Sequence, residues 1–224
     1  MIFPTIVTTT NEWRDKIKEA DRLGIKEISL FPTCLGRDER NELYALLAKS
    51  KIERIPFVHL RDDFEPWEME LLINQWGTKI FNTHSVASHP FLFDLSAYYG
   101  MIYLENFRRF FSDEELKQFA GLCLDSSHLE NDRRFQPDRF QGFQKIFSSH
   151  PVGCNHINGI RKEAYYKIGE EDRCDAHFLK DLSELDYLKN YPKRYFSDFI
   201  ALEMENDFET QIRAKEYILS LGIF

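Results

Sequence analysis

The chain has 224 residues, of which 43% are hydrophobic and 15% aromatic, a composition typical of one globular domain rather than a disordered protein. Its formal net charge is −8 and it has no run of basic residues, so bulk electrostatics do not favour binding to DNA. Its four cysteines include no CxxC pair, which argues against a thiolate zinc site or a redox pair. We expect no leader segment and no membrane span, and therefore a cytoplasmic protein.

In the first half of the chain, short apolar stretches alternate with amphipathic ones. Strands are expected at Ile2–Val7, Lys26–Phe31, Ile55–Leu60 and Lys79–Thr83. Helices are expected at Asn11–Leu23, Arg37–Lys49, Pro66–Trp76 and Phe91–Tyr99. Gly24 stops the first helix, and Pro66 suits the first turn of the third.

The second half repeats this alternation. Strands are expected at Met101–Glu105, Leu122–Asp125, Val152–His156 and Phe199–Glu203. Helices are expected at Ser112–Ala120, Pro137–Phe147, Phe178–Asn190 and Phe208–Leu221, and a long polar connection at Asn158–Asp175. Strict alternation of strand and helix favours a parallel sheet. Eight such units predict one domain, residues 1–224, folded as a single (β/α)₈ TIM barrel.

Histidines and acidic residues stand where the predicted strands end. His59, His84, Glu105, Asp125, His156 and Glu203 each close or follow a strand, His128 comes three residues after Asp125, and Asp175 and His177 lie in the adjoining connection. Because active sites of closed barrels lie at the carboxyl ends of the strands, these nine side chains are expected to converge.

Imidazole nitrogen and carboxylate oxygen together suit zinc, manganese or iron. Several acidic groups at one barrel mouth would repel one another without a cation, and buried carboxylates are costly unless they are paired or coordinated. The sequence therefore predicts a divalent-metal site, with zinc as the first candidate and manganese or iron as alternatives.

The order and context of these residues resemble the xylose isomerase-like TIM barrels, which include sugar isomerases and epimerases as well as endonuclease IV. Residues 121–128 (GLCLDSSH) resemble the LDxxH segment of that superfamily, and residues 103–106 (YLEN) resemble its strand-five ligand segment. Residues 155–158 (NHIN) resemble its HxND segment, with Gly159 departing from the expected acid. Leu202-Glu203 resembles the strand-eight ligand, and Asp175-Ala176-His177 resembles the DxH pair that endonuclease IV uses for a third metal.

The resemblance implies that this chain is a metal-dependent phosphoester hydrolase similar to endonuclease IV, with one to three bound ions. Glu105, Glu203 and His128 would be its catalytic residues, with Glu105 orienting the attacking water. The alternatives are a single-metal sugar or sugar-phosphate isomerase or epimerase, and a non-catalytic metal-binding barrel. The expected partner is a small phosphorylated or sugar-like molecule, because the net charge does not favour DNA.

Two further interpretations concern the rim of the predicted site. His59, His84, Asp175 and His177 are expected to form a second metal position beside the one held by Glu105, Asp125, His156 and Glu203. The cationic residues Arg61, Arg108, Arg161 and Lys162 could hold a phosphate, and ordinary surface charge is an equally good interpretation of each.

Overall fold

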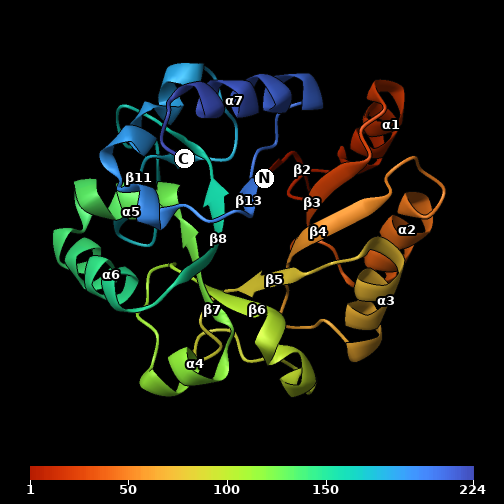
Figure 1. The fold of residues 1–224 in the computed structure, drawn as a ribbon, viewed down its shortest axis with the longest axis horizontal. Helices are drawn as coiled ribbons and strands as arrows, with labels where there is room; N and C mark the ends of the chain where they lie inside the picture. Colours follow the sequence, from red (N-terminus) through yellow and green to blue (C-terminus); the bar gives the residue numbers. More distant parts are fainter.

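The computed structural model describes residues 1–224 and contains a nine-stranded parallel sheet curved into a nearly closed barrel (Figure 1). Around the sheet the strands are β1 (Ile2–Phe3), β13 (Ile200–Leu202), β8 (Val152–Ile157), β7 (Gly121–Asp125), β6 (Ile102–Glu105), β5 (Ile80–Thr83), β4 (Arg54–His59), β3 (Glu27–Phe31) and β2 (Thr5–Val7). The architecture is that of a TIM-like barrel, as the alternation in the sequence predicts.

The two ends of the sheet meet at the amino terminus of the chain. β1 pairs with β13 and β2 pairs with β3, and only Pro4 separates β1 from β2. Proline has no N–H to donate to a ladder, so the stretch Ile2–Val7 changes partner at that residue. One short segment thus contacts both edges of the sheet.

Helices cover the outside of the barrel (Figure 1). They are α1 (Trp13–Leu23), α2 (Arg37–Leu47), α3 (Pro66–Trp76), α4 (Asp113–Gln118), α5 (Ser126–Phe135), α6 (Pro137–Ser149) and α7 (Phe208–Ser220). Gly24 and Gly77 end α1 and α3 in the left-handed conformation, and Ser112 opens α4 with a capping box. None of the helices is long and apolar enough to cross a membrane.

The apolar core has two parts. The larger cluster has 45 buried residues and fills the space between sheet and helices. The smaller cluster comes from strands alone and therefore fills the inside of the barrel: Phe3, Val7, Phe31, Phe57, Ile80, Cys123, Cys154 and Ala201. The rings of Phe31 and Phe57 lie 4.7 and 5.2 Å from the His156 ring, so this inner cluster forms the floor of the barrel mouth.

Two expected helices differ in the structure, and one helix was not expected. The predicted helix Phe91–Tyr99 is wrong, because a 3₁₀ turn, η1 (Ser96–Met101), takes its place. The predicted helix Phe178–Asn190 is instead the 3₁₀ segment η2 (Leu182–Asn190), which Asp181 caps, followed by η3 (Lys193–Tyr195). The helix α5 was not predicted at all.

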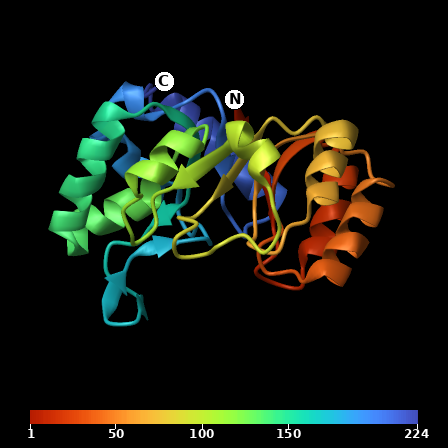
Figure 2. The ribbon, with the colours of Figure 1, turned by 90° about the horizontal axis from the view of Figure 1, so that it is seen from below.

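The polar connection after β8 is folded rather than irregular. It contains β9 (Gly159–Ile160), β10 (Tyr166–Ile168), β11 (Glu171–Arg173) and β12 (Asp175–Ala176). β10 and β11 form an antiparallel hairpin that turns at Gly169, whose φ is +61°. Figure 2 shows this hairpin, in cyan, projecting from the body of the barrel.

Candidate metal centre

The carboxyl ends of the strands bring the predicted residues together around one glutamate. Glu105, the last residue of β6, has a side chain only 1% exposed. Side chains from the ends of β4 and β8 and from the segments after β5 and β7 face its carboxylate. Asn82, on β5, donates a 2.6 Å hydrogen bond from Nδ2 to Glu105 Oε2 and so orients the group.

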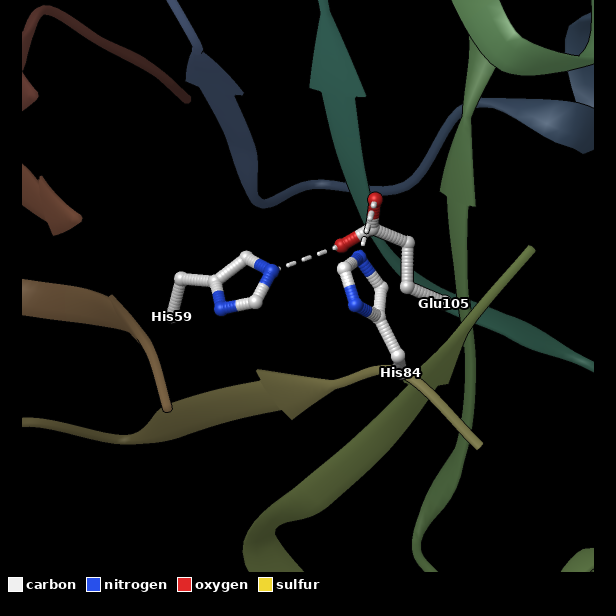
Figure 3. A group of neighbouring side chains, drawn as sticks. All are labelled: His59, His84 and Glu105. Atoms are coloured by element: carbon white, nitrogen blue, oxygen red, sulfur yellow. Dashed lines mark ion pairs between the residues drawn. The ribbon is translucent and has the colours of Figure 1, made fainter. Parts of the chain in front are cut away.

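His59 and His84 approach the carboxylate of Glu105 from one side (Figure 3). His59 Nε2 lies 3.2 Å from Glu105 Oε2, and His84 Nε2 lies 3.8 Å from Oε1. The Nδ1 atom of His59 is 2.8 Å from the carbonyl oxygen of Leu60. A carbonyl can only accept, so Nδ1 carries the proton and Nε2 presents its lone pair, the arrangement usual for metal-binding histidines.

A second group shares Glu105 and adds Asp125, His156 and Glu203. His156 Nδ1 lies 3.2 Å from Glu105 Oε2, 3.6 Å from Glu203 Oε2 and 4.0 Å from Asp125 Oδ2. The other oxygen of Asp125, Oδ1, accepts hydrogen bonds from Ser127 Oγ and from the His128 backbone N–H. Asp125 is therefore the N-cap of α5, and its Oδ2 atom is left for the centre.

Several of these polar atoms are buried without a hydrogen-bond partner. They are Asp125 Oδ2, both ring nitrogens of His156 and Nδ1 of His177. A buried polar atom without a partner costs free energy, and few occur in native structures. A divalent cation satisfies a carboxylate lone pair or the one lone pair of a neutral imidazole, so Asp125, His156 and His177 each offer an atom that fits a metal ion.

Burial and mutual charge perturb the titration of these groups. Burial and the charge of Glu105 raise the pKa of Asp125 to about 6. Burial also opposes the charge on Glu105, but the charge of the neighbouring His156 outweighs it and holds the pKa of Glu105 well below its ordinary range. Burial and the positive charge of Arg173 lower the pKa of His128 to about 4, so its imidazole is neutral at pH 7.

The remaining three predicted ligands lie on the hairpin side of the mouth. His128 Nδ1 is 3.4 Å from Glu105 Oε1, and its Nε2 is 3.5 Å from Asp175 Oδ2. His177 Nδ1 lies 3.7 Å from Glu203 Oε1. The structure thus divides His59, His84, Asp175 and His177, which were expected to share one position: the first two group with Glu105 and the last two do not.

Arg173 is a residue of this site that the sequence interpretation missed. Its side chain is 1% exposed, and its Nε and Nη2 atoms donate to both oxygens of Asp175, at 2.8 and 2.6 Å. Such a bidentate pair is among the strongest charge-assisted contacts in proteins. Both oxygens of Asp175 therefore accept hydrogen bonds from a guanidinium, and the role of Asp175 as a metal ligand stays a prediction. The signal in the sequence was the Arg-x-Asp spacing, because residues two apart in extended chain face the same side.

The other candidate cations have different surroundings. Arg61 bonds Asp63 at 2.9 Å, and Arg161 is paired with Glu184. Arg108 lines a cavity that begins at His84. Surface pairing thus accounts for Arg61 and Arg161, and Arg108 alone of the three borders the metal groups.

Comparisons with family models and with curated proteins returned no match for this chain. The xylose isomerase-like barrels are therefore named only for the resemblance of the sequence motifs.

Proposed function

We propose that this protein is a divalent-metal-dependent phosphoester hydrolase whose site resembles that of endonuclease IV. We further propose that Ile2–Val7 counts as one strand interrupted at Pro4, which makes the barrel an eight-stranded (β/α)₈ barrel of the xylose isomerase-like type. Zinc is the expected metal, because imidazole and carboxylate ligands in this mixture suit it, and manganese and iron are alternatives.

The proposal rests on one carboxylate, Glu105, which belongs to all three groups of potential metal ligands; two of these groups contain only histidine and carboxylate side chains. Its partners are His59 and His84 on one side and Asp125, His156 and Glu203 on the other. A carboxylate shared in this way is what a two-metal centre needs, because paired ions sit only about 3.5–4 Å apart in phosphoester hydrolases. In a single-metal site, the histidines of the first group would not bind a metal.

Each residue then has a defined role. Two bound divalent ions would supply Lewis-acid polarisation of a phosphoryl group and a water nucleophile at neutral pH. Glu105, which stays ionised, holds both positions, and Glu203 completes the second. The neutral His128 faces Glu105 and Asp175, where it can bind a phosphoryl oxygen or a metal. We expect two ions rather than three, because Arg173 already neutralises Asp175.

The substrate is proposed to be small and phosphorylated. The net charge of −8 opposes a long nucleic-acid backbone. We therefore expect little incision of DNA at abasic sites. Efficient incision that falls steeply with added salt would show that the charge argument misjudges the partner.

The runner-up is a single-metal sugar or sugar-phosphate isomerase. The four-residue group of Glu105, Asp125, His156 and Glu203 favours it, because these side chains alone can complete one site. Glu105 and Glu203 would then also move the proton beside a carbonyl. In that case His59 and His84 would bind substrate hydroxyls.

Metal count decides between these proposals. Elemental analysis and anomalous scattering should find two ions per chain in the purified protein. His84→Asn should lose the ion of the first group, and Glu203→Gln the ion of the second. His150→Asn is the matched control, because this ring lies at the end of α6, beside the Ile146 carbonyl.

Turnover is measured on the same three variants. Hydrolysis of bis(p-nitrophenyl) phosphate should fall at least about 100-fold in the first two variants and stay unchanged in the third, since a lost ligand disables metal chemistry. One ion per chain, together with isomerisation of a sugar phosphate, would show that the protein is a single-metal isomerase. Two ions per chain, without hydrolysis of phosphoesters or isomerisation of sugar phosphates, would favour a non-catalytic metal-binding barrel.

A further inference from the structure

A cavity opens directly beside the first ligand group. Its volume is about 550 Å³, and its walls include His84, Ser88, Phe107, Arg108, Arg109 and Glu171. Cavities of about 300–1,000 Å³ are typical of small-molecule sites. The walls come from the segments after β5 and β6 and from the hairpin strand β11, so the cavity lies between the barrel rim and the hairpin.

The cavity and the candidate metal centre share one side chain, His84. With side chains 29% and 33% exposed, His84 and His177 are the most open of the nine predicted site residues, whereas Glu105 is buried. The ring of Phe107 stacks on that of His84 at 4.7 Å and contacts that of His128 at 5.0 Å. A substrate whose reacting group lies at His84 and Glu105 would therefore extend over Phe107 into the cavity.

The cavity wall is cationic in a chain that is acidic overall. Its charged residues are Arg108, Arg109 and Glu171. Glu171 is already held by Arg139 through two 3.0 Å hydrogen bonds, and it lies 3.4 Å from Arg108 Nε. Arg109 contacts only a neutral partner, the hydroxyl of Ser88, at 3.3 Å. The two guanidiniums thus keep most of their donors free for an anion.

The backbone at this wall is held in an unfavourable conformation. Arg108 has φ +57° and is the one residue other than glycine in the left-handed region. The Arg109 N–H donates to the Phe107 carbonyl at 2.6 Å, which closes a three-residue turn around Arg108. Residues with a Cβ rarely adopt this backbone conformation. Residues that are held in it cluster at ligand-binding sites.

We propose that this cavity binds a second phosphate of the substrate, with Arg108 and Arg109 as its anchors. The substrate is then a small phosphoester with one phosphoryl group at the ligand groups and another phosphate on the far side of Phe107. This inference rests on the proposed hydrolase function for the first phosphoryl group. The cavity lies beside the metal centre and shares His84 with it, but its proposed anchors, Arg108 and Arg109, are not metal ligands.

Two matched pairs of compounds test the proposal on the zinc-loaded protein. The first pair consists of two phosphodiesters that each join p-nitrophenol to propanediol. In one of them the far hydroxyl of the propanediol carries a terminal phosphate, and in the other this hydroxyl is free. The second pair is propanediol bisphosphate and 3-hydroxypropyl phosphate, compared by calorimetric binding. In each pair the terminal phosphate should improve kcat/KM or affinity about tenfold, as expected for charge-assisted hydrogen bonds at a half-exposed site.

Variants assign that preference to the cavity. In Arg108→Gln and Arg109→Gln, the preference for the terminal phosphate should fall from about tenfold to below about threefold. Arg54→Gln is the matched control: Arg54 begins β4, at the end of the strand opposite His59, and is an exposed arginine paired with Glu27. The Arg54→Gln variant should prefer the compounds with a terminal phosphate as strongly as the unaltered protein does.

The outcomes separate this inference from the proposed function. If both diesters are cleaved equally well, or if Arg109→Gln keeps the full preference, the cavity is not a phosphate site although the hydrolase function stands. If neither diester is cleaved but the bisphosphate still binds more tightly, and does so through Arg108 and Arg109, the cavity assignment stands and the hydrolase function fails.

Discussion

Glu105→Gln is the sharpest perturbation of the candidate centre, because it removes a charge and keeps the shape. Glu105 Oε2 lies 3.2 Å from both His59 Nε2 and His156 Nδ1. Its carboxylate is the only one that belongs to every ligand group of the structure. The substitution should therefore weaken both metal positions at once.

The size of the effect follows from ligand linkage. An ion supplied at 1,000 times its Kd stabilises the folded state by about 4 kcal/mol. For a chain of this length, about 1 kcal/mol moves Tm by about 2–4 °C, so each bound ion should raise the Tm of the unaltered protein by about 8–16 °C. Loss of an outer-shell partner weakens metal binding by about 10–100-fold, and a lost ligand should reach at least the upper figure. The gain in Tm per ion should then fall to about 3–6 °C in Glu105→Gln.

The assay is calorimetric unfolding with excess zinc and with excess chelator, at one protein concentration. The difference between the two Tm values isolates the metal contribution from any change in the stability of the metal-free chain. Glu130→Gln is the matched control: Glu130 is also a buried glutamate, but it is paired with Arg133 and Arg134 on α5. It should lower Tm under both conditions and keep the full metal-dependent gain.

If zinc raises the Tm of Glu105→Gln as much as that of the unaltered protein, Glu105 is not a metal ligand. If Glu130→Gln loses the zinc-dependent rise in Tm, the effect is not specific to Glu105, because removing any buried carboxylate would then abolish it.

Two predictions concern stability outside the centre. Glu68→Ala should cost about 3–5 kcal/mol in urea unfolding, because it leaves the fully buried Arg40 guanidinium without its bidentate partner, and an unchanged midpoint would contradict this. Burial opposes ionisation of Glu130, but hydrogen bonds from Arg133 and Arg134 outweigh it and lower its pKa. A carboxylate whose pKa is lower in the folded state stabilises the fold at every pH above its unfolded pKa, about 4.3. This stabilisation is lost as pH falls from that value through the folded-state pKa. The stability difference between the unaltered protein and Glu130→Gln should therefore be large at pH 7 and shrink below about pH 4, and a pH-independent difference would rule this out.

The barrel was predictable because its strands are short apolar runs separated by amphipathic helices. The helix α5 was not, because the pattern that marks helices is absent from it. Its buried residues are mostly polar, and they include Glu130 and Asp132, which bond to arginines. The segments β9, β11 and β12 contact α5, so tertiary contacts rather than an apolar stripe determine its burial.

The candidate centre was predictable where barrel geometry alone determines position. Residues that end neighbouring parallel strands must meet at one mouth, and His59, Glu105 and His156 do so. Asp175 and Arg173 lie in a connection whose path depends on the hairpin, and no strand periodicity anticipates it. The sequence therefore indicated which residues could bind a metal there but not which one an arginine had already engaged.

The charge of the mouth bears on how many ions it takes. Glu105, Asp125, Asp175 and Glu203 carry four negative charges when ionised, and Arg173 offsets one of them through Asp175. Two divalent cations would turn the remaining three negative charges into a single positive charge, which matches a phosphodiester monoanion. A third cation at Asp175 would compete with a buried guanidinium for its bidentate partner, and breaking such a pair costs about 3–5 kcal/mol. If the centre binds two ions, as proposed, Arg173 supplies the positive charge beside Asp175 and that pair stays intact.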